Sequence, residues 1–299
     1  MMWFWLALAA LLCWSGSDIF SKVGSAPDDK YSHWKMVMAV GFVMGLHALY
    51  EVLVGGVEIS WHVMLAYLPA SLLYILSMIL GYVGLRYIEL SVSSPICNSS
   101  GALAAILLLV IFKETMQPLQ GLAVGMVCVG VVALGLVEYF ESDDTRAARQ
   151  EQSNRKYVKS FVAILLPVLY CMIDAAGTVA DAVILQDINE DSANVAYELT
   201  FLLMAVLSFV YVVLIKREKL LVRREAPKVI AGVFETAGQL AYVYALSENA
   251  VFSAPIISSY CVVSILWSRI FLKEKLSIKH YAAIAVTVAG IVILGLFGD

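Results

Sequence analysis

The chain has 299 residues, of which 61% are hydrophobic and 15% are charged, and its formal net charge is −4. A soluble globule of this length needs more charge on its surface, so the composition excludes a soluble protein and predicts one that crosses a membrane several times. The negative net charge gives no support for nucleic-acid binding. The five cysteines lie inside apolar runs without CxxC spacing. That pattern favours small buried hydrophobes over disulfides or ligands, and we expect neither a metal nor a cofactor.

Apolar runs of membrane-spanning length occur throughout the chain. A helix needs about 20 apolar residues to cross the hydrocarbon of a bilayer. Because backbone groups cannot remain unpaired in lipid, each run is expected to be an α-helix. The first run lacks a basic leader and a small-residue cleavage site, so it is interpreted as a span rather than a cleaved signal. The predicted spans are 2–22, 34–54, 62–84, 91–112, 117–138, 160–184, 195–215, 229–247, 250–272 and 278–297.

The positive charges are distributed unevenly over the connections between spans. If the N-terminus lies outside, nineteen of the 20 Lys and Arg residues fall on the inner side and only Lys113 falls on the outer side. Asp187, Glu190 and Asp191 then crowd an outer loop. Cytoplasmic connections are the ones that carry excess Lys and Arg. This bias predicts that both termini are extracytoplasmic.

Two blocks of the sequence match at a fixed separation of 160 residues. Each contains Ser-x-Pro-Ile around Pro95 or Pro255, then Lys-Glu at Lys113 or Lys273, then Leu-Gly-Leu. A register without gaps that includes Pro and Lys-Glu predicts two copies of one unit. We expect a first repeat at 1–138, a cytoplasmic linker of mixed charge at 139–159 and a second repeat at 160–299. Five spans per repeat make the second repeat inverted, which is typical of secondary transporters that bind substrate near the midplane.

This arrangement, with the Ser-x-Pro-Ile, Lys-Glu and Leu-Gly-Leu block closing each half, resembles the drug/metabolite transporter superfamily, specifically its EamA-like ten-span members. The resemblance implies an all-α basket of helices around a central cavity and gradient-driven or proton-driven movement of small metabolites. It also implies a bacterial plasma (inner) membrane. The family handles amino acids, sugars, nucleotide derivatives, amines and drugs, so the substrate stays open. Several members are described with cytoplasmic termini, whereas the distribution of Lys and Arg predicts extracytoplasmic termini for this chain. We retain the prediction from the charges.

Polar and aromatic side chains recur at helical spacing inside several spans and predict a cavity wall. Ordinary helix packing is an equal alternative for the aromatic residues. Asp174 and Glu235 lie near mid-membrane, where a carboxylate is costly, so function is favoured over structural pairing. Asp18, Asp181 and Glu198 lie nearer to span ends and are expected to have no such role. The predicted substrate-binding residues are Trp14, Tyr74, Tyr82, Asn98, Asp174, Glu235, Gln239, Tyr242, Tyr260 and Trp267.

The substrate class follows from the charge of this wall. No Lys or Arg lies at the centre of a span, and rings with carboxylates attract ammonium groups, so an organic cation or amine is predicted. A carboxylate removed from water also takes up a proton more readily, which makes Asp174 or Glu235 the predicted proton-coupling group. The alternative is an exporter of amino acids or other zwitterionic or neutral metabolites.

Three further patterns have simple structural alternatives. Pro95 and Pro255 occupy equivalent positions and are candidates for a paired hinge, the alternative being first-turn residues. His47 and Glu51 lie one turn apart, and a satisfied pair is favoured over a proton relay. Tyr67 lies near a span end and is expected at the membrane interface.

Catalysis is not predicted. The chain contains no HExxH, no GxSxG and no Gly-rich phosphate loop, and its four histidines are scattered over separate elements. The expected partners are a small-molecule substrate, the lipid bilayer and protons as coupling ion. Transport by alternating access as a monomer or a homodimer is therefore preferred over an enzyme.

Overall fold

The computed structural model describes residues 2–26, 28–113, 116–140, 161–273 and 276–297. Within these ranges the chain is helical and forms no strand. In the same ranges, ten helical segments are long and apolar enough to cross a membrane. Five of them precede residue 141 and five follow residue 160. Most of the predicted linker, 139–159, lies outside the described residues.

The first five spans contain seven helical elements. Three spans are single α-helices, the second continues into a π-helical turn, and the fourth is divided into two helices. The elements are α1 (Met2–Gly24), α2 (Ser32–Tyr50), η1 (Glu51–Gly55), α3 (Trp61–Gly84), α4 (Leu90–Asn98), α5 (Ser100–Phe112) and α6 (Pro118–Tyr139).

The second five spans repeat this organisation. The seventh span of the chain, like the second, ends in a π-helical turn, and the ninth, like the fourth, is divided into two helices. The elements are α8 (Phe161–Ile184), α9 (Glu190–Phe209), η2 (Val210–Ile215), α10 (Val222–Glu248), α11 (Ala250–Ser258), α12 (Tyr260–Trp267), η3 (Ser268–Leu272) and α13 (Ile278–Phe297).

Local signals explain several helix boundaries. The side chain of Ser60 accepts a hydrogen bond from the Val63 N–H at the start of α3, and Asn249 caps α11 through the Phe252 N–H. The matching Lys113 and Lys273 end their spans with φ of 52° and 59°, in the left-handed region. The Lys-Glu repeat in the sequence therefore corresponds to the same helix stop in both halves.

The packing of helices is reproduced when the two halves are exchanged. α1 packs along α10, and α3 packs along α8. Because α1 is equivalent to α8 and α3 is equivalent to α10, these two contacts are counterparts of each other. The contact of α2 with α10 likewise has its counterpart in the contact of α9 with α3. Three further contacts, α2 with α9, α5 with α11, and α6 with α13, join equivalent spans to each other. This is the pattern of two five-helix repeats in inverted relation.

The fourth and ninth spans break at equivalent residues. α4 gives way to α5 at Ser99 and α11 gives way to α12 at Ser259, each four residues after a proline inside the helix. Both prolines thus lie in helix interiors, where proline weakens the preceding turn, and not in first turns. The interrupted spans contact each other across the two repeats.

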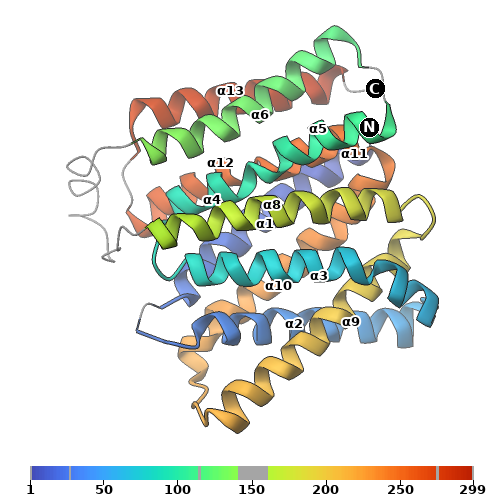
Figure 1. Ribbon diagram of the computed structural model, residues 1–299, viewed down its shortest axis with the longest axis vertical. Helices are drawn as coiled ribbons and strands as arrows, with labels where there is room; N and C mark the ends of the chain where they lie inside the picture. Colours follow the sequence, from blue (N-terminus) through green and yellow to red (C-terminus); the bar gives the residue numbers. More distant parts are fainter. Residues whose placement is uncertain (1, 27, 114–115, 141–160, 274–275, 298–299) are drawn as a thin grey trace.

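The stacking of the helices fixes where open space can lie. Figure 1 shows α6 and α13 at one end of the long axis and α2 and α9 at the other. Between these ends lie the α1–α10 pair, the α3–α8 pair and the interrupted spans. Side chains from these central helices converge on one interior region.

Candidate functional site

A central cavity lies among α1, α3, α4, α8, α10, α11 and α12. It has two parts, with empty volumes of about 500 Å³ and 530 Å³ that include space open to solvent. The two parts share six lining residues and therefore adjoin each other. The shared residues are Trp14, Met78, Asn98, Tyr170, Glu235 and Tyr260.

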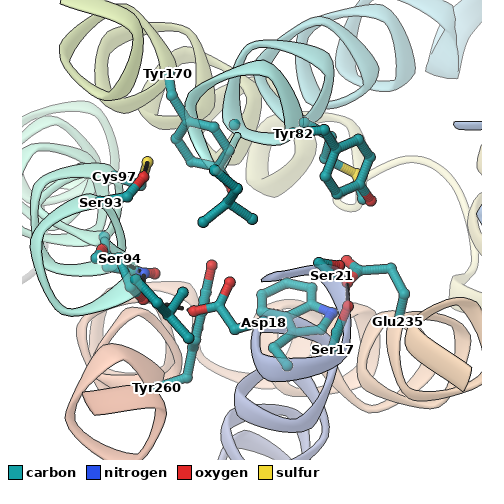
Figure 2. Close-up of a pocket in the computed structure, with 16 residues that line it drawn as sticks. Ser17, Asp18, Ser21, Tyr82, Ser93, Ser94, Cys97, Tyr170, Glu235 and Tyr260 are labelled. Carbon is teal, nitrogen blue, oxygen red and sulfur yellow. Dashed lines mark hydrogen bonds between the residues drawn. The ribbon is translucent and has the colours of Figure 1, made fainter. Parts of the chain in front are cut away.

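Three carboxylates line this cavity: Asp18, Asp174 and Glu235. In Figure 2 the Asp18 carboxyl points into the open space near Ser94 and Tyr260. No Lys or Arg belongs to either set of lining residues within the described part of the chain. The cavity is therefore acidic without a lining cation.

Serine hydroxyls hold each of these carboxylates. Ser94 donates to Asp18 at 2.5 Å and Ser17 donates to Glu235 at 2.5 Å. Two serines, Ser77 at 3.3 Å and Ser100 at 2.7 Å, donate to Asp174. Hydroxyl donors orient a carboxylate and partly replace its water without neutralising its charge. The hydroxyls therefore fix the positions of the three acids without supplying a positive charge.

The nearest buried lysine is occupied with backbone groups. Lys22 lies one turn beyond Asp18 on α1, and its Nζ donates to the carbonyl of Leu85 at 2.5 Å and to that of Ile88. These carbonyls belong to the connection after α3, where helical acceptors lack intrahelical partners. Lys22 thus caps the end of α3 beside the cavity.

Aromatic rings form much of the remaining wall. The ring centroids of Trp14 and Tyr242 are 5.0 Å apart, and those of Trp14 and Tyr260 are 5.9 Å apart. Trp14 lies directly against Gly238, where a Cβ atom would collide with the indole. Glycine at this position therefore allows the indole to sit beside α10.

Three side chains at the cavity have polar atoms without a hydrogen-bond partner among the described residues. These atoms are Trp14 Nε1, Tyr82 O–H and Gln239 Nε2. Tyr82 and Gln239 are buried, with 6% and 3% of their surface exposed. A buried donor without a partner is costly, so all three are suited to a ligand that carries acceptor oxygens or nitrogens.

The structure brings nine of the ten predicted substrate-binding residues to the cavity. Trp14, Asn98, Glu235 and Tyr260 line both parts, Tyr82 lines one, and the other part receives Tyr74, Asp174, Gln239 and Tyr242. Trp267 lies elsewhere: its indole donates to Ser15 at 3.4 Å and packs near Phe271. The candidate hinge residues Pro95 and Pro255 are buried and do not line the cavity.

Two residues near span ends lie in the interior, where the sequence did not predict a role for them. Tyr67, expected at the membrane interface, is fully buried and donates to Asp181 at 2.6 Å. Asp18 lines the cavity. The distance from a span end did not reveal these environments, because helices in a bundle can bury any depth of a span.

His47 forms a pair that the sequence did not indicate. Its Nδ1 is 2.9 Å from the carboxylate of Glu198, which is fully buried on α9, while Nε2 is 3.6 Å from Glu51. The stronger contact thus joins the two repeats. It lies between α2 and α9, away from the residues that line the central cavity.

Sequence reasoning missed the serine partners, and it left Tyr170 out of the predicted substrate-binding residues. Ser17, Ser77, Ser94 and Ser100 are small polar residues whose carboxylate partners lie at distant sequence positions. Tyr170 lines both parts of the cavity. Its spacing of four residues from Asp174 placed it on the acidic face of its span, and this was the one available signal.

Comparison with known proteins places this geometry in context. The model described as the EamA-like transporter family matches residues 1–136 and, a second time, residues 161–296. No curated protein matches the sequence. A solved structure described only as a crystal structure of a protein has a TM-score of 0.65 and 17% identity, and the match covers 98% of this chain and 96% of that one. At that identity the likeness concerns the fold alone.

Proposed function

The chain belongs to the EamA-like transporter family, and from this premise we propose that it moves a small organic cation or amine by proton-coupled alternating access. It is a multi-pass membrane protein, and the family is one of transporters of small molecules and not of enzymes.

The acidic cavity carries the proposal. Asp18, Asp174 and Glu235 line one cavity, and no Lys or Arg lines it within the described residues. A carboxylate away from bulk water is destabilised unless a positive charge or a proton accompanies it. The rings of Trp14 and Tyr260 on the same wall attract ammonium groups through their faces. An organic cation satisfies both features of the wall at once.

Proton coupling follows from competition for the same charge. A carboxylate binds either a proton or an ammonium group, so occupation by one weakens the other. Asp174 and Glu235 remain the preferred coupling groups because both line the same part of the cavity. A carrier built in this way exchanges a cation on one side of the membrane for a proton on the other.

Alternating access is supported by the inverted repeats. Two packed halves in inverted relation can exchange conformations, so that the same site opens first to one side and then to the other. Pro95 and Pro255 lie at equivalent places in the two interrupted spans, which contact each other. We propose that these two spans bend at their breaks during the exchange.

The proposed orientation has both termini outside the plasma membrane. Basic connections from both halves meet at one end of the helices: Lys35 lies 3.8 Å from Glu225, and Arg224 pairs with Asp28 at 3.1 Å. Arg86 donates to the Lys30 carbonyl at 3.0 Å. Clustering of Lys and Arg at one end is typical of the cytoplasmic side.

One observation favours a second candidate, a zwitterionic metabolite such as an amino acid. Trp14 Nε1 and Gln239 Nε2 are donors without partners at the cavity. A carboxylate on the substrate would accept from these donors while its ammonium group faces the acids. A simple quaternary amine leaves the donors unsatisfied.

A thermal-shift screen of the detergent-purified protein tests both candidates. Quaternary amines, polyamines, amino acids and sugars are compared at neutral and at acidic pH, because a ligand that binds only the folded state raises the melting temperature. Stabilisation by amines that weakens at acidic pH, and that is lost in Asp174→Asn or Glu235→Gln, supports the proposal. Glu58→Gln, in the exposed connection before α3, is the matched control. Stabilisation by amino acids alone selects the second candidate, and stabilisation by neutral sugars alone refutes both.

A further inference from the structure

A hydrogen-bonded cluster closes one end of the central cavity. Tyr67 O–H donates to Asp181 Oδ1 at 2.6 Å, and Tyr74 O–H donates to Oδ2 at 3.4 Å. The Tyr74 hydroxyl also contacts those of Thr178 and Tyr242. We call Tyr67, Tyr74, Asp181 and Tyr242 the tyrosine–aspartate layer. Its four side chains are all buried.

Residues in and next to this layer line two open spaces. Tyr74, Thr178 and Tyr242 line the central cavity. Ala182 and Leu246, one turn further along α8 and α10, line a second pocket near the connection between α8 and α9. The barrier is therefore only about one helical turn, roughly 5 Å, thick.

The layer also joins the two repeats. Tyr67 and Tyr74 come from α3 in the first repeat, while Asp181 and Tyr242 come from α8 and α10 in the second. Separation of the repeats at this end requires the phenol–carboxylate bonds to break. Bonds to an ionised acceptor are stronger than bonds between neutral groups. The charge of Asp181 consequently determines how firmly this end is closed.

The opposite end of the cavity lacks an equivalent lock. The residues 160 positions before Asp181 and Tyr242 are Ser21 and Tyr82, and both line the cavity. The Tyr82 hydroxyl is without a partner among the described residues. Ser21 Oγ has a long contact of 3.9 Å with the sulfur of Met36. Within the described part of the chain, the equivalent positions of the two repeats thus form a carboxylate-centred lock at the α8–α9 end and not at the other.

We propose that Asp181 is a proton-binding residue whose protonation unlocks the tyrosine–aspartate layer and opens the cavity toward the α8–α9 connection. This inference rests on the proposed alternating-access function. When ionised, Asp181 accepts from two phenols and holds α3 against α8. When a proton from the α8–α9 side binds Asp181, one carboxyl oxygen becomes a donor and the negative charge is lost. The carboxyl group can then no longer accept hydrogen bonds from both phenols as the carboxylate does. The proton is carried as the acid and no other bond changes.

Asp181 is the group in this layer that can titrate between acidic and neutral pH. The titratable groups facing the layer are the phenols of α3, the phenol of Tyr242 on α10 and that of Tyr197 on α9, whose ring packs on Tyr74. On α8 itself, Asp174 lies two turns away and bonds serines instead. α4 and α5, which also pack against α8, carry no charged side chain. Phenols keep their protons well above the range in which a carboxyl titrates.

Thiol labelling tests this proposal without a substrate. A full-length variant with its five native cysteines replaced and Ser258→Cys introduced at the cavity is reconstituted in liposomes. A membrane-impermeant maleimide is added from the α8–α9 side. Rates are normalised to the denatured protein at the same pH, because thiol reactivity itself varies with pH. We expect acidification to accelerate labelling, and Asp181→Asn to accelerate it about tenfold at neutral pH and to abolish the response to acid.

Two further variants keep the test decisive. Tyr67→Phe retains the charge and removes one bond, so it should raise labelling at neutral pH while keeping the response to acid. Asp187→Asn, the same substitution on the exposed connection after α8, should behave as the parent does. Unchanged labelling in both Asp181→Asn and Tyr67→Phe, or a response to acid that persists in Asp181→Asn, overturns the proposal. Since no amine is present, failure of the proposed substrate class leaves this result unaffected.

Discussion

Ser17 on α1 donates a hydrogen bond of 2.5 Å to Glu235 on α10, and this bond joins the two repeats inside the cavity. The hydroxyl stabilises the charged form of the carboxylate and holds it toward the open space (Figure 2). The affinity of the cavity for a cation therefore depends on a side chain from the opposite repeat.

Removal of this hydroxyl should change the pH dependence of amine binding. In Ser17→Ala the charged form of Glu235 loses a donor, so a proton competes with the amine at higher pH than in the parent. We expect the pH at which amine-induced stabilisation is half lost to move upward by about one unit or less, since one such bond contributes about 1 kcal/mol. Thermal shift measured over a pH series gives this midpoint. Ser21→Ala, one turn further on α1, is the control, and an equal displacement there would contradict the specific role of Ser17.

Alanine substitutions at two glycines of α6 should have opposite effects. A Cβ at Gly130 would collide with Thr287 on α13 and lie 3.0 Å from the Ala283 carbonyl, whereas a Cβ at Gly125 meets nothing within 4 Å. Gly130→Ala should therefore destabilise the protein by about 1–3 kcal/mol through overpacking. Gly125→Ala should be neutral or stabilising by about 0.5–1 kcal/mol, because glycine weakens a helix. Melting temperatures of the two variants decide, and equal values would show that the α6–α13 contact is looser than described.

Removal of one partner of the His47–Glu198 pair should destabilise the protein more than removal of both partners. Glu198 is fully buried and its carboxylate lies 2.9 Å from His47 Nδ1. His47→Leu leaves that carboxylate without its partner and should cost about 3–5 kcal/mol. The double variant His47→Leu/Glu198→Leu should recover much of this loss, since two apolar groups replace a buried ionic pair. The free energies of unfolding of the parent and the variants are measured in mixed detergent and compared as a double-mutant cycle.

The control for this cycle is the weaker contact of the same histidine. Glu51 lies 3.6 Å from His47 Nε2 and is partly exposed. Glu51→Gln should cost less than about 1 kcal/mol, as exposed pairs do. Additive losses in the double variant, in place of recovery, would mean that His47 and Glu198 stabilise the protein independently.

The contribution of Asp29 to stability should depend on pH. Asp29 lies in the connection between α1 and α2, and although its burial favours the neutral acid, the hydrogen bond and charge of Lys35 at 2.9 Å lower its pKa below the ordinary value. A lowered folded-state pKa stabilises the fold above the unfolded value of about 4 and loses that contribution as the pH falls through the folded value. Asp29→Asn should therefore lower the melting temperature equally at neutral and mildly acidic pH. The difference from the parent should shrink below about pH 4. A difference that grows on acidification would reverse the assigned sign.

Local sequence patterns were sufficient for the number of spans and for the repeat. Every predicted span overlaps one of the ten membrane-length helices found in the described ranges. The fixed offset of 160 residues corresponds to helix breaks at Ser99 and Ser259 and to left-handed Lys113 and Lys273. These features depend on runs of apolar residues, proline and local backbone geometry, which each segment carries by itself.

Helical spacing identified much of the cavity wall and failed for one residue at the far end of its helix. Tyr74 and Asp174 both line the cavity, and each lies on the face of its own helix that spacings of three and four residues predicted. Trp267 stands at the end of α12, after a break at Ser259 and before the π-helical turn η3. Tyr260 and Trp267 belong to the same regular helix, but Trp267 is two turns further along it, so a shared face did not bring it to the depth of the cavity.

The sequence by itself determined that this protein crosses the membrane ten times as two inverted repeats, because hydrophobic length and a repeated register are properties of the chain alone. Only the tertiary structure decided which polar groups meet. The partners Ser17 and Glu235 are 218 residues apart and Tyr67 and Asp181 are 114 apart. Such pairs depend on which helix faces pack together, and in lipid that choice is made by close packing and interhelical hydrogen bonds, which no single segment contains.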